Sequence, residues 1–307
     1  MWKSVMNEKV AIILVNYNGK QFNNSCIQSI LKSTVKEDLI VVVVDNASND
    51  DSLQDLKMNW GEHSQVHVIS LDDNYGFSKA NNIGIRWAME QGIEKYILLN
   101  NDTEIESEAI EKMLQCQTKH KGIVVPKILF ADKQDIIWYA GGKLSSVIRK
   151  PIPIGFNQKD TEKYNSDYKC DFANGCCMLL TKEIVDHIGY LDERFFLYYE
   201  DTEYSLRAQK NQIEIWYCGS AVVYHKVNGS TKGNENPLSV YYITRNWLLC
   251  NSIYLKWRFG LFYVYFILNR MAWTGIWLLE GKIGLIRMIW RGIADYRNKT
   301  FGRAIKY

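Results

Sequence analysis

Short apolar runs alternate with segments of helical periodicity over the first third of the chain. The run Leu39–Val44 is almost continuously apolar, which is typical of a parallel strand buried on both faces. A sheet with helices on both faces is the architecture that such alternation predicts, so we expect an α/β fold. The predicted strands are 10–15, 39–44, 66–69 and 96–99, and the predicted helices follow Gly19 and cover 78–91.

Polar clusters follow three of these strands, at 16–18, 45–50 and 100–102. Because the carboxyl ends of parallel strands share one edge of a sheet, we expect the three clusters to meet there. Directly after the third cluster, Thr103 and Glu106 have the spacing of a capping box, which predicts a helix that begins at once.

The second half of the chain has a mixed pattern. From about Leu238 the periodicity is helical and amphipathic to the end. Before that point, 155–169 is polar and is predicted to be a flexible loop, and 195–207 is predicted to pass from strand-like aromatic residues into a helix. Further strands are predicted at 123–126, 176–180, 213–217 and 221–224.

The helical tail differs from the rest of the chain in charge. Residues 245–307 hold eleven Lys and Arg against two Asp and Glu, whereas the whole chain has a net charge of only +3. Arg258 and Arg270 bracket the longest uncharged stretch, so a membrane-spanning helix is not expected. We expect a helix lying in the membrane interface, with Phe262, Phe266, Trp273 and Trp277 on the lipid-facing side. The alternative is a helical appendage that packs these rings against the first domain or a partner subunit.

Composition narrows the class of protein. The chain has 307 residues, of which 47% are hydrophobic and 23% charged, as in a folded globular protein. The small net charge argues against a dedicated nucleic-acid binder, so no nucleic-acid partner is expected. Seven cysteines without a CxxC pair argue against a zinc ribbon or a disulfide scaffold, and we interpret them as reduced thiols of a cytosolic chain. The apolar run at 10–15 is too short for a signal peptide.

Three groups of polar residues carry candidate chemistry, and each has a structural alternative. Asp102, in the cluster 100–102, is suited to hold a divalent cation, or the cluster is only a turn that caps the next helix. Glu200 and Asp201 follow an aromatic run, where burial would favour a general base, or they are solvated acids at a helix start. His225 closes an apolar strand as a metal ligand or as a core histidine. No glycine-rich phosphate loop is present, so bound phosphates would need a cation or side chains.

Taken in order, these motifs resemble family 2 glycosyltransferases, and within that family the bacterial rhamnosyltransferase-like branch. The resemblance covers about residues 9–250. It rests on Val15-Asn16-Tyr17-Asn18, Val44-Asp45-Asn46-Ala47-Ser48-Asn49-Asp50, Asn74-Tyr75-Gly76-Phe77 with Asn82-Ile83-Gly84, Leu99-Asn100-Asn101-Asp102, Phe196-Leu197-Tyr198-Tyr199-Glu200-Asp201 and His225.

The resemblance implies a glycosyltransferase A-type fold, a Rossmann-like mixed sheet with helices on both faces, and a nucleotide-sugar donor. Asp45 is implied to accept the ring N3–H of uracil or thymine, and Lys79 is the candidate substitute for an arginine usual beside Asn82. The donor-binding positions implied together are Val15, Asn16, Tyr17, Asp45, Asn74, Gly76, Lys79, Asn82, Asn100 and Asn101.

The resemblance also implies a metal site and a base. The family's Asp-x-Asp motif corresponds to 100–102, where only the final carboxylate is kept. Asp102 and His225 are implied to hold Mg²⁺ or Mn²⁺, and Asp201 is implied to be the catalytic base with Glu200 beside it. Arg245-Asn246 also matches a recurring pair, to which we assign no chemical role at this point.

The implied function is an inverting, metal-dependent glycosyltransferase of bacterial surface polysaccharide (O-antigen) synthesis. It would move rhamnose from dTDP-rhamnose to a hydroxyl of a glycan or lipid-linked acceptor. One alternative uses a UDP-hexose on the same fold, and another is a non-catalytic nucleotide-sugar-binding partner of a glycan synthase. We expect a catalytic domain over 1–237 and a C-terminal helical region over 238–307 for membrane association or homo-oligomer formation. The expected location is cytoplasmic and peripheral, on the inner face of the bacterial cell membrane.

Overall fold

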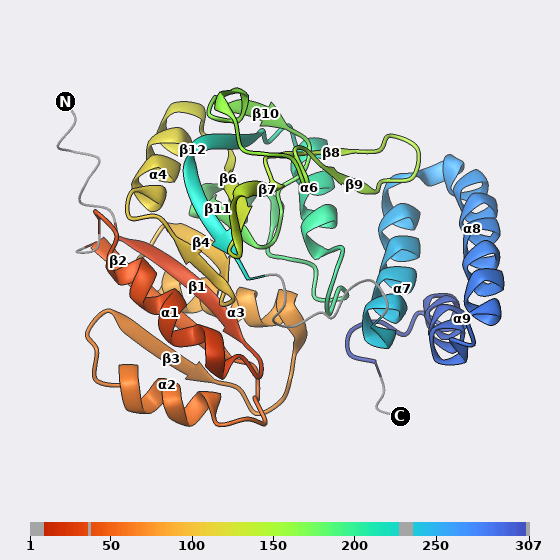
Figure 1. Ribbon diagram of the computed structural model, residues 1–307, viewed down its shortest axis with the longest axis horizontal. Helices are drawn as coiled ribbons and strands as arrows, with labels where there is room; N and C mark the ends of the chain where they lie inside the picture. The colour runs from red at the N-terminus through yellow and green to blue at the C-terminus, as the bar shows by residue number, and fades with distance from the viewer. Residues whose placement is uncertain (1–8, 36–37, 227–235, 305–307) are drawn as a thin grey trace.

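The computed structural model of the protein describes residues 9–35, 38–226 and 236–304. A large mixed sheet forms the centre of the first domain, with strand order β10-β12-β6-β11-β4-β1-β2-β3 and with β5 and β7 paired to β12 and β6. Helices cover both faces of this sheet (Figure 1). This is the glycosyltransferase A-type fold that the sequence led us to expect.

The first half of the sheet is parallel. Its strands are β1 (Val10–Asn16), β2 (Leu39–Asp45), β3 (Val66–Ser70) and β4 (Lys95–Asn100). The helices between them are α1 (Lys20–Leu31), α2 (Ser52–Trp60) and α3 (Gly76–Glu90). Gly84 lets α3 pack closely on β1, because a Cβ at this position would lie 2.5 Å from Ile13 Cγ2. The parallel register brings Asn16, Asp45 and Asn100 to the same edge, as predicted.

The second half of the sheet is mixed. β11 (Cys177–Thr181) runs antiparallel to both β4 and β6 (Ile123–Phe130), and β12 (Ile215–His225) runs parallel to β6. The carboxyl end of β12 therefore reaches the same edge as that of β4. The remaining elements are β5 (Thr103–Ile105), α4 (Ala109–His120), β7 (Lys133–Tyr139), β8 (Gly142–Leu144), β9 (Pro151–Pro153), the 3₁₀ turn η2 (Glu162–Tyr164), β10 (Tyr168–Cys170), α5 (Lys182–Ile188) and α6 (Glu200–Lys210).

Several local predictions were wrong. Residues 103–105 form a strand, because Thr103 pairs with His225 of β12, and the next helix begins only at Ala109. The segment 155–169 is ordered around buried Tyr164, whose carbonyl accepts a hydrogen bond from Tyr217 Oη at 2.8 Å. The two short strands predicted at 213–217 and 221–224 are one strand with an irregular register between Cys218 and Val222. Residues 195–199 form no strand.

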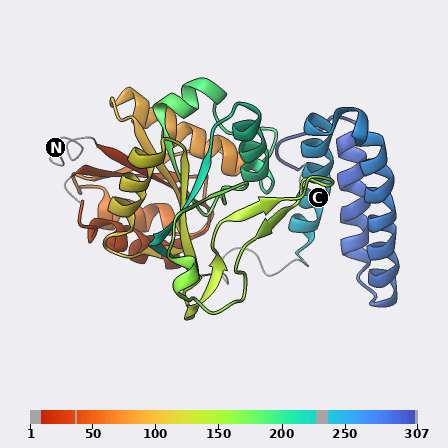
Figure 2. The ribbon, with the colours of Figure 1, turned by 90° about the horizontal axis from the view of Figure 1, so that it is seen from above.

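The tail forms a small helical bundle beside the first domain. It comprises α7 (Pro237–Tyr254), the short 3₁₀ turn η3 (Lys256–Arg258), α8 (Phe259–Leu279) and α9 (Ile283–Arg297). Asn236 caps α7 through a side-chain oxygen that accepts from Leu238 N at 2.9 Å. In both views α7 lies against the first domain and α8 lies on the outside (Figures 1 and 2). None of the described helices combines the length and the hydropathy that crossing a membrane requires.

The aromatic stripe that we expected to face lipid is mostly internal. Phe262, Phe266 and Trp277 are buried in a core shared with Trp247 of α7 and with α9, whereas Trp273 is 41% exposed. Our assignment of these rings to an exposed face was therefore wrong. Burial of these three rings turns the opposite face of α8 outward.

Candidate active site

Asn16 is the hub of the polar edge of the sheet. Its side chain is fully buried, and its Nδ2 donates to Asp45 Oδ1 at 2.6 Å and to Ser52 Oγ at 2.9 Å. Its Oδ1 accepts from Asn23 Nδ2 at 2.9 Å and from Asn101 Nδ2 at 3.1 Å. These bonds connect the ends of β1, β2 and β4 with α1. Val15 lies beside this hub at the end of β1, and Tyr17, the next residue after Asn16, is 41% exposed.

Asp45 lies behind the surface of the site. It is 0% exposed, and Oδ1 accepts from Asn16 and from Ser48 Oγ at 2.7 Å. Oδ2 accepts from Ser48 N at 3.2 Å. In this arrangement the carboxylate shapes the loop after β2, and a base could reach it only if the loop opened. A contact between Asp45 and the base stays a prediction.

Asn46 is a site residue to which sequence reasoning gave no role. It joins the loop after β2 to the turn before α3, because its Nδ2 donates to Asn74 Oδ1 at 2.9 Å and its Oδ1 accepts from Tyr75 N at 2.8 Å. Gly76 is required in this turn, since it has a φ of +81° and a Cβ there would lie 2.4 Å from Phe196 O. The position of Asn46 directly after Asp45, in the same polar cluster, was the available signal.

The first turn of α3 contacts the segment that leads to α6. Phe77 N and Ser78 Oγ both donate to main-chain carbonyls there, those of Phe196 and Phe195, each at 2.7 Å. Lys79 lies in the first turn of α3, with its ammonium 3.7 Å from the centre of the Tyr75 ring. The start of α3 is therefore fixed against the residues that precede the carboxylate pair.

Asn82 is buried, and both the oxygen and the nitrogen of its side-chain amide form hydrogen bonds. Its Oδ1 accepts from Leu191 N at 3.0 Å, and its Nδ2 donates to Leu191 O at 2.9 Å and to Glu193 Oε1 at 3.0 Å. In the described structure, Asn82 thus holds the segment before α6 against α3. A direct donor contact for this residue stays a prediction.

Asp102 and His225 form a buried pair at the sheet edge. The pairing of β5 with β12 brings them together, and His225 Nε2 lies 3.3 Å from Asp102 Oδ1. Asp102 Oδ1 has no hydrogen-bond partner among the described residues. The same is true of His225 Nδ1, the ring nitrogen that is not in this contact. A buried carboxylate oxygen without a partner is costly unless another group binds it. Asp102 Oδ1 and His225 Nε2, an oxygen and a nitrogen donor 3.3 Å apart, are close enough to share one divalent cation.

The other two residues of the 100–102 cluster have different surroundings. Asn101 Nδ2 points back into the amide network, where it donates to Asn23 Oδ1 at 2.8 Å as well as to Asn16. Asn100 N donates to Cys176 O at 2.8 Å, which places the segment 174–176 next to the end of β4. The side chain of Asn100 is half-buried. Of this cluster, only Asp102 joins the carboxylate–histidine pair.

Glu200 and Asp201 begin α6, directly after Tyr198 and Tyr199, which both have left-handed φ angles, 67° and 71°. Asp201 Oδ2 accepts from Gly175 N at 3.1 Å, and Oδ1 accepts from Thr202 N at 2.6 Å. Gly175 adjoins Cys176, the residue bonded to Asn100. Asp201 is therefore linked through two backbone contacts to the strand end that carries Asp102.

The environment of this carboxylate pair favours protonation. Burial raises the pKa of Asp201 above its ordinary value, although the N–H groups of Gly175 and Thr202 oppose the rise. Burial and then the charge of Asp201 raise the pKa of Glu200 far more, and Glu200 Oε2 has no hydrogen-bond partner among the described residues. Glu200 is thus suited to stay neutral while Asp201 titrates, which is the behaviour of a general base.

Arg245 and Asn246, the pair left without a role, contact the turn before α6. Asn246 Nδ2 donates to Leu197 O at 2.9 Å and to Tyr198 O at 2.8 Å. Arg245 is 0% exposed, and its Nε donates to Asn246 Oδ1 at 3.0 Å. Arg245 Nη1 donates to Gly302 O at 2.8 Å, near the end of the chain. The helical tail therefore contributes to the support of the turn before Glu200 and Asp201.

The sequence model of glycosyl transferase family 2 matches residues 11–189, more than half of the chain. The chain therefore belongs to this family and is a glycosyltransferase, and our identification of the family from its motifs is confirmed. Relatives named as rhamnosyl transferases also support the likeness to that branch.

Two curated relatives align over most of this chain. The low-salt glycan biosynthesis hexosyltransferase Agl10 of Haloferax volcanii is 29% identical over 304 residues, which cover 96% of this chain and 89% of the relative. The dTDP-rhamnosyl transferase RfbF of Shigella flexneri is 28% identical over 249 residues, which cover 78% of this chain and 79% of the relative.

Solved structures agree on the fold. The structure of GalNAc-T7 with UDP, GalNAc and Mn²⁺ has a TM-score of 0.67 and 16% identity, and the alignment covers 83% of this chain and 50% of that one. The structure of S. aureus TarS 1-349 with UDP has a TM-score of 0.53 and 17% identity, with 80% of this chain and 65% of that one covered.

Proposed function

We propose that this protein is an inverting glycosyltransferase that moves a sugar from a nucleotide diphosphate to an acceptor hydroxyl. The observation that supports this most is the linkage of two acidic centres at one sheet edge. Asp201 is bonded to Gly175, and the neighbouring Cys176 is bonded to Asn100, two residues before Asp102. This linkage supports a base and a diphosphate site beside each other, which a single displacement at the anomeric carbon requires.

Asp201 is the residue that would take the proton from the acceptor hydroxyl as its oxygen attacks the anomeric carbon. Its partial exposure leaves it open to the acceptor, and its raised pKa improves it as a base. The hydrogen bonds from Gly175 and Thr202 orient the carboxylate. Because attack and departure occur on opposite faces of the sugar, one such step inverts the anomeric centre.

Asp102 and His225 are the residues that would hold Mg²⁺ or Mn²⁺. A bound cation would stabilise the charge of the diphosphate leaving group. The residues supply only one carboxylate and one imidazole, so most of the remaining coordination would come from the donor's phosphates and water. Lys79, in the first turn of α3, would add a positive charge near the donor.

We propose dTDP-rhamnose as the donor, because the likeness to a dTDP-rhamnosyl transferase covers more than three quarters of both chains. A hexose on UDP is the second candidate, and the similarity to a hexosyltransferase favours it. The acceptor would be a hydroxyl of a glycan or of a lipid-linked sugar in surface polysaccharide synthesis. A panel of dTDP- and UDP-sugars, scored by release of the nucleotide diphosphate with and without Mn²⁺, separates the two donors. Binding without release from any donor would contradict the enzyme and favour a non-catalytic partner of a glycan synthase.

We also propose that the outer face of α8 lies in the membrane interface, where a lipid-linked acceptor would be reached on the cytoplasmic side. Exposed apolar residues recur there every three or four positions from Leu261 to Met271, and Leu268 is 61% and Leu279 91% exposed. The outer face of α8 comprises Leu261, Val264, Leu268, Met271, Leu278 and Leu279. An exposed stripe of this kind is the apolar half of an interfacial helix.

Charges around the outer face of α8 fit an anionic lipid surface. The one charged residue within α8, Arg270, is turned inward, over the rings of Trp247 and Phe266 at 5.3 and 5.4 Å. Lys256 and Arg258 are exposed just before the helix, where they can contact headgroups. An apolar crevice of about 370 Å³ between the turn 145–148 and the start of α8 adjoins this face.

Flotation with vesicles of phosphatidylglycerol and phosphatidylethanolamine tests this placement. The wild-type protein should float with the vesicles and do so less at high salt, whereas the double variant Val264→Glu/Leu268→Glu should remain behind. Met58→Glu is the control, because Met58 is an even more exposed apolar residue, on α2 and away from α8. A wild-type protein that stays unbound would contradict binding to the membrane interface. A dimer that the double variant dissociates would also contradict it and would assign the outer face of α8 to a second copy.

A further inference from the structure

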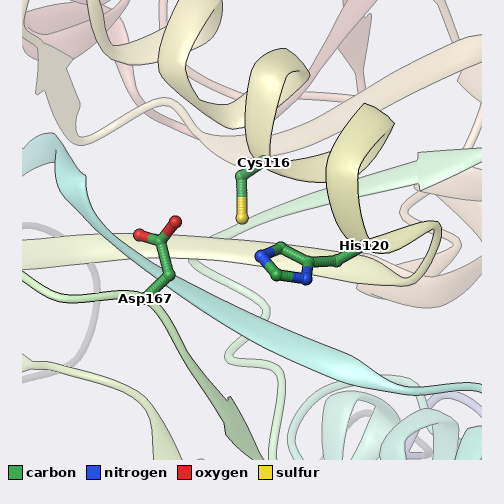
Figure 3. A group of neighbouring side chains, drawn as sticks. All are labelled: Cys116, His120 and Asp167. Atoms are coloured by element: carbon green, nitrogen blue, oxygen red, sulfur yellow. The ribbon is translucent and has the colours of Figure 1, made fainter.

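A second group of metal-binding side chains lies away from the catalytic edge. Cys116 and His120 stand four residues apart on α4 and therefore on one face of the helix. Asp167 approaches them from the residues just before β10 (Figure 3). The group adjoins Trp216, near the amino end of β12, whereas His225 closes the carboxyl end of that strand. The two sites are thus separated by the length of β12.

The three side chains are directed at one another. One ligand atom from each of Cys116, His120 and Asp167 lies within 4.8 Å of the other two. The thiol of Cys116 points into the space between the carboxylate and the imidazole (Figure 3). Cys116 is 3% exposed, whereas Asp167 is exposed and keeps a path to solvent.

The histidine is held in place but lacks a partner for one nitrogen. Its ring stacks on Trp216 with centroids 3.5 Å apart and planes 15° from parallel. His120 Nε2 is buried and has no hydrogen-bond partner among the described residues. A buried ring nitrogen without a partner, next to a thiol and a carboxylate, is the condition that a metal ion relieves.

We propose that Cys116, His120 and Asp167 bind a thiophilic divalent cation, Zn²⁺ or a metal of similar chemistry. A set of one sulfur, one nitrogen and one oxygen donor suits zinc, whereas Mg²⁺ and Ca²⁺ prefer oxygen alone. Binding would release the thiol proton of Cys116 to solvent, and water would fill the fourth position from the exposed side of Asp167.

The observed spacing needs only a small contraction. Zinc bonds of about 2.0–2.3 Å in a tetrahedron place donor atoms roughly 3.3–3.8 Å apart, against a spacing of at most 4.8 Å here. Asp167 is already oriented by Gly219, whose N donates to Oδ1 at 3.1 Å. The ion would tie α4 to the segment before the edge strand β10, far from Asp102 and Asp201. Its role would therefore be structural.

Cobalt spectroscopy of the full chain tests the proposal. The protein is treated with a chelator, reduced, and titrated with Co²⁺, whose bond to a thiolate gives a charge-transfer absorption that an oxygen site does not. We expect this absorption in the wild-type protein, its loss in Cys116→Ser, and its displacement by Zn²⁺. Cys170→Ser, a partly exposed cysteine outside the group, is the matched control and should keep it.

A second variant protects the test against misfolding. Asp167→Asn keeps the acceptor for Gly219 N on an exposed residue, so it should fold even if Cys116→Ser does not. It should lower Co²⁺ affinity by at least the roughly 10–100-fold that loss of an outer partner costs. Absence of the charge-transfer band in the wild-type protein would overturn the proposal. So would a band that survives Cys116→Ser but is lost in Cys176→Ser. The thiols of Cys116 and Cys218 are within hydrogen-bonding reach of each other, and a disulfide between them without metal uptake would also overturn the proposal.

Discussion

The side-chain amide of Asn246 donates to the carbonyl of Tyr198 at 2.8 Å and so ties helix α7 to the turn before Asp201. The same amide donates to Leu197 O at 2.9 Å. Tyr198 and Tyr199 both have left-handed backbones, which for residues other than glycine cost about 1–3 kcal/mol each and persist only when surroundings hold them. The tail thus stabilises the turn that positions Asp201, the proposed base.

Removal of the Asn246 amide should therefore reduce turnover more than donor binding. Asn246→Ala loses its two neutral hydrogen bonds to the turn, each worth about 0.5–1.5 kcal/mol, and also the acceptor of Arg245 Nε. We therefore expect kcat to fall by at least about tenfold to a hundredfold with little change in donor KM. Steady-state kinetics and far-UV circular dichroism measure this. Ser252→Ala, which removes only a local bond to Leu249 O on the same helix, is the control. An unchanged kcat would show that the turn keeps its conformation without the Asn246 hydrogen bonds.

Truncation of the tail should inactivate the enzyme, even though every proposed ligand and base precedes residue 226. A chain ending at Asn251 lacks α8 and α9, which form the core around Trp247, and lacks Gly302, whose carbonyl accepts from Arg245. Arg245 would then keep a buried charge with fewer partners, which is strongly destabilising. We expect a lower melting temperature and loss of turnover on a water-soluble acceptor. A truncated protein as active as the full chain would contradict this dependence.

Much of the first half of the fold could be predicted because periodicity is a local property. β5 could not, because its partner His225 is far along the chain and the local Thr103–Glu106 pattern favoured a helix. The role of Asn82 depends on Leu191, 109 residues away. Helix α8 is apolar on nearly all sides, so the pattern alone could not decide which face packs. Only the structure shows that Arg270 points inward, and this identifies the face of α8 that packs.

The pH dependence of turnover should report the raised pKa of Asp201. The base must be ionised, so activity should be lost as the pH falls through this pKa, and the acid limb should lie above the ordinary aspartate value of 3.8. Asp201→Asn should lower kcat by about 10²–10⁴-fold at pH values above this pKa and remove the limb. Asp192→Asn, an acid on the same approach segment that is paired with Arg194, is the control. An acid limb that survives Asp201→Asn would assign the base elsewhere.

Glu200 should lower the stability of the protein at neutral pH. Its folded pKa is raised, so its favourable contribution is full at low pH and is lost as the pH rises through that pKa. Glu200→Gln keeps the shape without the charge, and we expect it to melt at a higher temperature than wild type above that pKa, with the two curves converging in acid. Thermal melts across pH measure this. A lower melting temperature at neutral pH would mean that Glu200 carries a favourable charge.

Substitutions of Asp102 and of His225 should reduce metal-dependent turnover to different extents. Asp102→Asn removes the only carboxylate of the proposed site, so its activity should fall to the level of wild type in excess chelator. His225→Ala removes one neutral ligand that water can replace, so Mn²⁺ should restore activity at a higher concentration. Activity titrated with Mn²⁺, together with Mn²⁺ binding followed by electron paramagnetic resonance, separates affinity from catalysis. Asp167→Asn, at the distant thiol site, should titrate like wild type. Full wild-type activity in chelator would instead assign charge neutralisation to Lys79 and other side chains.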